Sequence, residues 1–242
     1  YAAVSWKQGM PLMEIGKLGG KSTEAIGANS KAARIDDPLA IGNTFATFVT
    51  PQVAAPAVMK IARGGVRPAA DRPPDLIEPG CISRGQAVAF KNARRQTVYG
   101  IHYPPLNPHC RGPKGSLPPA LVLAHGGPTS MADAGFKPRV QFYTSRGFTV
   151  LDVNYAGSTG YGRAYRERLD GQWGIADVAD CAAAARHLSQ AGLADPGKIA
   201  IAGGSAGGYT TLMALATTKA FAAGSSHYGI SDLALLLAHT HK

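Results

Sequence analysis

One stretch of this chain constrains its fold more than any other, the segment from residue 198 to residue 219. Residues 199–202 are all apolar, as expected for a strand that is buried on both faces. Residues 203–207 read GGSAG, and a helical pattern follows them. The larger apolar residues of that pattern fall on one helical face: Leu212, Leu215 and Ala216. A strand, a sharp turn and a helix in this order are typical of a parallel α/β sheet.

The turn itself matches the pattern G-x-S-x-G, in which a serine is lifted out of a tight strand-to-helix connection. Side chains two residues before and after that serine would collide, so glycine is needed at Gly203 and Gly207. Ser205 is therefore the candidate nucleophile, and the following helix directs the positive end of its dipole toward it. The backbone N–H of Ala206 is a candidate donor to an oxyanion. A glycine-rich turn alone would also fit a plain connection, but the flanking strand and helix favour the nucleophile.

A second glycine-rich motif, His125-Gly126-Gly127-Pro128, follows an apolar run at residues 120–125. In α/β hydrolases the loop at this position often supplies a second oxyanion donor. We expect that donor to be the N–H of Gly127. His125 stands at a strand end and precedes the serine, so we expect it to hydrogen-bond the loop and not to act as the catalytic base.

Strand-like and helix-like patterns alternate from about residue 79 onward. The expected strands are residues 86–91, 96–103, 120–125, 148–154, 199–202 and 221–228. The expected helices, besides the one after Ser205, are residues 136–146, 177–191 and 233–238, with Asp177 and Ser231-Asp232 as N-caps. This order predicts that residues 79–242 form an α/β-hydrolase domain with a doubly wound, mostly parallel sheet.

Residues 1–78 have a different pattern, with short β-like runs and no helical periodicity. The runs cover residues 1–6, 11–18, 38–50 and 53–62, and turn residues separate them. Residues 67–79 are rich in proline and read as an interdomain linker. We interpret residues 1–78 as the end of an all-β module, such as part of a β-propeller, followed by this linker.

Composition excludes several classes of function. The formal net charge is +10, but the basic residues are scattered and form no run, so we expect no nucleic-acid partner. No apolar run approaches the roughly 20 residues of a membrane span. The three cysteines, Cys81, Cys110 and Cys181, show no metal-binding spacing, and we expect buried free thiols, no metal and a reducing, cytoplasmic location.

Several longer segments resemble the prolyl oligopeptidase family of serine peptidases, on its dipeptidyl aminopeptidase and acylaminoacyl-peptidase side. They are HGGPTS at residues 125–130, SRGFTVLDVNYAGSTGYGRAYRE at 145–167, GQWGIADVAD at 171–180 and GGSAGGY at 203–209. The resemblance covers residues 81–242 and implies a Ser-Asp-His triad, no cofactor, and a propeller that restricts access to short peptides. We interpret the loop at residues 154–162 and Trp173 as structural, with Trp173 packing against the helix that follows it.

The acid and base of the triad are expected to lie outside this chain. In this fold they follow the serine in the order Asp or Glu, then His. Asp232, His239 and His241 follow Ser205, but Asp232 is better explained as a helix cap and the two histidines come too soon after the serine. The sequence therefore reads as a fragment that is inactive alone. Two alternatives to a peptidase stay open: a carboxylesterase on the same fold, and a non-catalytic hydrolase-like module. The oligomeric state is not predicted.

Overall fold

A computed structural model describes the backbone of residues 2–7, 10–17, 20–26, 32–35, 39–41, 44–51, 57–62 and 65–68, together with Ala54 and residues 77–239. Side chains are described at Ala54 and from residue 77 to residue 238. Most of the expected linker and His241 lie outside the described residues.

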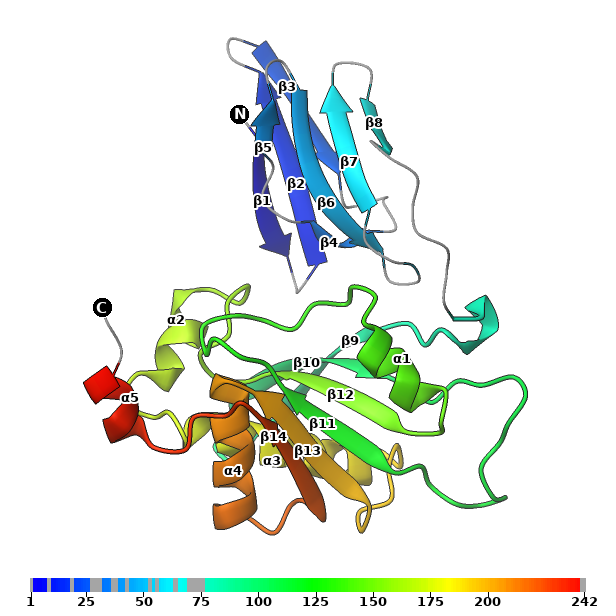
Figure 1. The fold of residues 1–242 in the computed structure, drawn as a ribbon, viewed down its shortest axis with the longest axis vertical. Coiled ribbons are helices and arrows are strands. Elements are labelled where there is room, and N and C mark those ends of the chain that lie inside the picture. Colours follow the sequence, from blue (N-terminus) through cyan, green and yellow to red (C-terminus); the bar gives the residue numbers. More distant parts are fainter. Residues whose placement is uncertain are drawn as a thin grey trace.

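The centre of the fold is a six-stranded mixed sheet (Figure 1). In chain order its strands are β9 (Gln86–Lys91), β10 (Thr97–Tyr103), β11 (Ala120–Ala124), β12 (Thr149–Asn154), β13 (Ile199–Gly204) and β14 (Ala223–His227). They lie side by side in the order β14-β13-β11-β12-β10-β9. The two pairings of β10 are antiparallel and the other three are parallel. The expected mostly parallel, doubly wound sheet is therefore confirmed.

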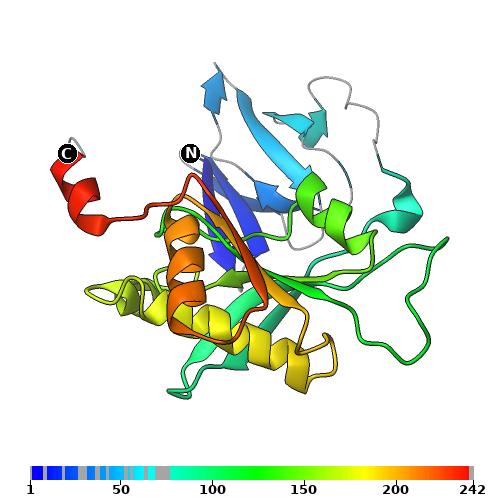
Figure 2. The same ribbon diagram turned by 60° about the horizontal axis from the view of Figure 1, so that its bottom comes forward.

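Helices cover both faces of this sheet. They are α1 (Pro138–Thr144), α2 (Arg163–Arg166), α3 (Ala176–Gln190), α4 (Ala206–Thr217) and α5 (Leu233–His239), with short 3₁₀ turns at Pro79–Cys81 and Glu167–Leu169. α3 and α4 pack side by side on one face (Figure 2), and α1 packs on the other. The molecule thus has the three layers of an α/β-hydrolase domain.

The packing of the core explains why these strands could be predicted from the sequence. Every residue of β11 and of β12 is buried, which requires near-continuous apolar runs. On the α3 side these strands meet Cys181, Ala184 and Leu188, all fully buried. The alanines let α3 approach the sheet closely, so this face of the domain is densely packed.

The N-terminal strands form two separate antiparallel sheets. One contains β1 (Ala2–Lys7), β2 (Met10–Lys17) and β3 (Gly20–Ile26). The other contains β4 (Ala32–Ile35), β5 (Leu39–Ile41), β6 (Thr44–Pro51), β7 (Ala57–Ala62) and β8 (Gly65–Pro68). The all-β character expected of this region is present. Among the described residues, no helix is long and apolar enough to cross a membrane.

Three expectations about single residues are corrected. Asp177 is not the N-cap of α3, because the helix begins one residue earlier, at Ala176. Leu212 and Leu215 do not form the buried face of α4: each is 39% exposed, while Thr210, Thr211 and Ala214 are buried. The neighbouring strand β14 is itself largely exposed. Cys81 and Cys181 are buried free thiols as expected, but Cys110 is exposed in the long loop after β10.

Candidate active site

Ser205 stands at the junction of β13 and α4 in a strained backbone conformation. Its φ of 54° and ψ of −120° place a non-glycine residue in a region that L-residues rarely occupy. The Ser205 N–H donates to the carbonyl of His227 at 3.1 Å, and its carbonyl accepts the N–H of Tyr209 at 3.1 Å. The serine is exposed, while Ala206 after it is buried. Strand, helix and the end of β14 therefore hold a strained serine at the surface.

Glycine is sterically required on both sides of this serine. A Cβ on Gly203 would lie 2.2 Å from the carbonyl oxygen of Gly207, and a Cβ on Gly207 would lie 2.1 Å from that of Ala124. Both contacts are with backbone, which cannot swing away. The turn therefore brings β13, α4 and the end of β11 into direct backbone contact.

The second glycine motif lies beside the serine. A Cβ on Gly126 would be 3.3 Å from the carbonyl oxygen of Gly204 and 3.6 Å from the Cβ of Ser205. Gly127 is exposed, has a φ of 128°, and is joined to Pro128 by a cis peptide bond. The structure thus brings the two motifs together at the carboxyl ends of β11 and β13, where ligands bind in open α/β sheets.

His125 is engaged by the loop and not by the serine. Its Nδ1 lies 2.8 Å from the carbonyl oxygen of Gly126, and its Nε2 lies 2.7 Å from the hydroxyl of Ser158. The ring stacks on Tyr155 with centroids 4.3 Å apart, and the Tyr155 hydroxyl donates to the His125 carbonyl at 2.6 Å. Burial lowers the pKa of His125 and keeps the imidazole neutral. The expectation that His125 hydrogen-bonds the loop is confirmed.

Two buried carboxylates of α3 fix the elements around the serine. Asp177 accepts the Gly174 N–H at 2.7 Å and the Thr210 hydroxyl at 2.5 Å, and so ties α3 to the first turns of α4. Asp180 accepts the Ala156 N–H at 2.9 Å in the loop after β12 and the side-chain amide of Asn92 at 2.8 Å. Burial raises the pKa of both carboxyls, although their hydrogen bonds oppose that shift.

A polar cluster supports the segment between Pro128 and α1. Asn154 accepts the N–H of Ala132 at 2.7 Å and donates to its carbonyl at 3.0 Å. The ammonium of Lys137 contacts Asp152 at 2.8 Å and the Asp133 carbonyl at 2.7 Å. Burial lowers the pKa of Lys137, but the charge and hydrogen bond of Asp152, together with Tyr103 and Asp133, outweigh burial and raise the pKa of the lysine. These bonds fix the path of the chain after the Gly127 motif.

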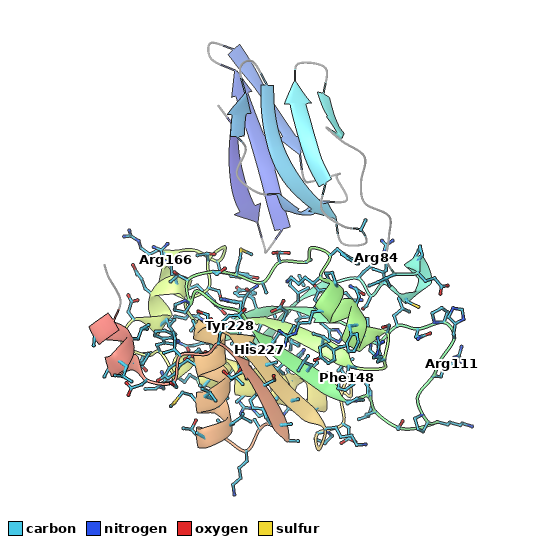
Figure 3. All side chains as sticks on the ribbon, in the orientation of Figure 1. Arg84, Arg111, Phe148, Arg166, His227 and Tyr228 are labelled. Atoms are coloured by element: carbon cyan, nitrogen blue, oxygen red, sulfur yellow. The ribbon has the colours of Figure 1, made fainter. Side chains whose placement is uncertain are left out.

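The side chains of Asp232 and His227 have partners other than Ser205. Asp232 accepts the N–H groups of Ala234 and Leu235 at 2.7 and 3.1 Å, which confirms it as a helix cap. His227, next to Tyr228 at the end of β14 (Figure 3), lies 3.1 Å from the hydroxyl of Ser225 and 3.5 Å from a guanidinium nitrogen of Arg139.

Other histidines are occupied as well. His102 contacts the Thr149 hydroxyl, His109 contacts Glu78, and His187 stacks on Phe90. Within residues 77–238, no histidine is hydrogen-bonded to the Ser205 hydroxyl. The described residues also contain no group of three or more His, Cys, Asp or Glu side chains placed to hold a metal ion.

A family model describes the C-terminal half of the chain. Residues 134–242 match the model of the prolyl oligopeptidase family, and this range contains the strained serine and its flanking glycines.

Curated relatives of this chain carry peptidase names. The chain is 40% identical over 118 residues to a dipeptidyl peptidase family member 6 of Caenorhabditis elegans, covering 48% of this chain and 16% of the relative. It is 38% identical over 120 residues to dipeptidyl aminopeptidase BIII of Pseudoxanthomonas mexicana, covering 49% and 17%. The chain therefore spans about a sixth of the length of these two relatives.

Solved structures match nearly the whole chain. A puromycin-hydrolyzing peptidase of Mycobacterium tuberculosis superposes with a TM-score of 0.89 at 36% identity, over 99% of this chain and 37% of its own. A puromycin hydrolase complexed with PGG gives a TM-score of 0.86 at 37% identity, over 94% and 34%. The similarity to solved structures thus extends to the N-terminal strands, although the chain spans only about a third of either protein.

Sequence reasoning missed the residues that connect the two motifs. Ser158 and Asp180 lie in segments read as structural, and their partners are 33 and 24 residues away in the chain. Trp173 contacts Tyr209 of α4, with ring centroids 5.3 Å apart. The sequence signal that could have found these residues is the presence of polar side chains at the ends of strands and in the first turn of a buried helix.

Proposed function

We propose that this chain is the nucleophile-bearing part of a serine-type peptidase that hydrolyses short peptides. The single observation that carries the proposal is the strained, exposed Ser205 at the end of β13, within a domain of the prolyl oligopeptidase family. A binding module has no need of such a backbone, because strain costs stability and persists where it serves function.

In the proposed reaction, the Ser205 hydroxyl attacks the carbonyl carbon of the scissile bond while a general base takes its proton. The N–H groups of Ala206 and Gly127 donate to the oxyanion that forms. The tetrahedral intermediate expels the amine, which receives the proton, and leaves an acyl-enzyme. Water then attacks the ester and releases Ser205. No cofactor is needed for these steps.

The base and its acid are proposed to be a His and an Asp outside this chain. Supporting this, the described histidines have other partners and Asp232 caps α5. We also propose the division into an N-terminal propeller-like part with its linker, residues 1–78, and a catalytic domain, residues 79–242. The antiparallel sheets of the first 68 residues support it.

Short peptides are the proposed substrates, because the relatives are named as dipeptidyl peptidases and a similar hydrolase was solved with PGG. A reducing compartment, the cytoplasm, is proposed on the basis of three free cysteines.

The test is turnover of aminoacyl-anilides, short peptides and nitrophenyl esters by the full-length protein that contains this chain. We expect amide cleavage that Ser205→Ala reduces by about 10⁶-fold in kcat, to background, and that Ser189→Ala on α3 leaves unchanged. Ester cleavage without amide cleavage would favour a carboxylesterase. A folded protein that cleaves neither would favour a non-catalytic module.

A further inference from the structure

Gly126 lies beside the nucleophile, since a Cβ on it would be 3.6 Å from the Cβ of Ser205. Its carbonyl oxygen and the N–H of Gly127 belong to the single planar peptide bond between these two residues. This bond is trans, because the cis bond of the motif is the next one along, so the oxygen and the N–H point in opposite directions. Whatever fixes the direction of the Gly126 carbonyl therefore also fixes the direction of the Gly127 N–H.

His125 holds that carbonyl through its Nδ1 at 2.8 Å. A carbonyl oxygen only accepts hydrogen bonds, so Nδ1 must carry the proton. The ring itself is immobilised by stacking on Tyr155, whose hydroxyl also donates to the backbone of His125. One side chain thus determines how the peptide of the proposed oxyanion donor is oriented.

Ser158 complements this protonation state of His125. The neutral ring has a single N–H, and with that proton on Nδ1 the other nitrogen must accept. Nε2 lies 2.7 Å from the Ser158 hydroxyl, which is fully buried. The hydroxyl is also 2.7 Å from the carbonyl oxygen of Tyr155, which the backbone N–H of Ser158 contacts at 3.0 Å. The hydroxyl has one proton, and Nε2 of this tautomer has none, so the two are hydrogen-bonded when that proton points at Nε2 and the Tyr155 carbonyl keeps the N–H.

We propose that Ser158 and His125 are positioning residues that act in series: Ser158 stabilises the tautomer of His125 with the proton on Nδ1, and His125 aims the Gly127 N–H at the oxyanion formed on Ser205. The inference rests on the proposed peptidase function. It gives the loop after β12 a role in rate and not only in folding, because the loop decides whether a donor two residues beyond His125 faces the substrate.

Two substitutions of His125 separate the contributions of its nitrogens. In His125→Asn the side-chain amide reaches the position of Nδ1 and can still donate to Gly126. In His125→Gln it reaches the position of Nε2 and keeps only the contact with Ser158. In the full-length protein we expect His125→Gln to lower kcat about 10- to 100-fold, part of the 10²–10³ that losing an oxyanion donor costs. We expect His125→Asn to stay within about 5-fold of wild type, and KM to change little in both.

A peptidyl trifluoromethyl ketone supplies an independent readout, because its adduct on Ser205 carries an oxyanion. Its inhibition constant should rise for His125→Gln in parallel with the loss of kcat. Equal kcat values for the two variants, or a loss confined to KM, would overturn the inference. A wild-type protein without Ser205-dependent turnover would instead refute the proposed function.

The variant Ser158→Ala leaves the imidazole ring of His125 in place, so it tests the proposal even if a His125 variant does not fold. Without the Ser158 hydroxyl, Nε2 loses its donor, so the tautomer with the proton on Nδ1 is less favoured and the donor to Gly126 is occupied for less of the time. We expect a several-fold lower kcat, and ¹⁵N NMR should show a smaller fraction of His125 with its proton on Nδ1. Thr159→Ala, in the same loop, should change neither. An unchanged tautomer and unchanged kcat in Ser158→Ala would refute the proposal.

Discussion

At the scale of single residues, the site depends on where side chains are absent as much as on where they are present. Gly203 and Gly207 allow three backbone segments to touch, since a Cβ at either place would lie within 2.2 Å of a carbonyl oxygen. Ser205 takes up the resulting strain at a φ of 54°. The glycines were predictable because their need is local. The contacts of Asp177 were not, because Thr210 is 33 residues away in the chain.

The buried carboxyl of Asp177 predicts a pH dependence of stability. Burial raises its pKa above the ordinary value of 3.8. The folded chain then holds the proton more tightly than the unfolded chain, so this carboxyl's contribution to the free energy of unfolding falls as pH rises from 3.8 toward the raised pKa. Asp177→Asn cannot titrate. Urea unfolding across this range should show wild type losing stability relative to the variant as pH rises, and parallel profiles would contradict the prediction.

At the scale of elements, α3 links the two halves of the site. One of its carboxylates, Asp177, bonds α4, and the other, Asp180, bonds the loop after β12 that holds His125. The sequence predicted this helix from its alanine-rich pattern, but placed Asp177 at its cap. The predicted N-cap was wrong because the Asp177 carboxylate makes a tertiary contact with α4, which periodicity cannot reveal.

Removing the second link should destabilise the domain. Asp180→Ala leaves the Ala156 N–H and the Asn92 amide without their acceptor in a buried setting. Each unsatisfied buried group costs about 1–3 kcal/mol, so we expect the free energy of unfolding to fall by about 2–4 kcal/mol. Asp195→Ala removes the same group from an exposed turn and serves as the control, with little change expected. Urea unfolding of both variants at neutral pH measures the difference, and equal effects would contradict it.

At the scale of the whole molecule, the fold was predictable because its signals are repeated. From β11 onward the strands alternate with helices, and two glycine motifs mark the ends of β11 and β13. The connections between Ser158, His125 and Asp180 were not predictable, because they arise only when β11, β12 and α3 come together. Leu212 and Leu215 are exposed although the periodicity placed them on one face of the helix. The sequence pattern predicts which residues share a helical face, but it does not show what packs against that face.

The same whole-molecule view predicts how the 242-residue chain behaves alone. Ser205 is exposed and held for attack, but the described histidines bond other groups. Loss of the general base costs about 10⁶ in turnover in a well-studied serine hydrolase. We therefore expect the isolated chain to react with a fluorophosphonate far more slowly than the longer protein, and mass spectrometry of the labelled serine measures both rates. The Ser205→Ala variants provide the background. Labelling of the isolated chain at the rate of the longer protein would contradict the prediction and would require a base within these residues.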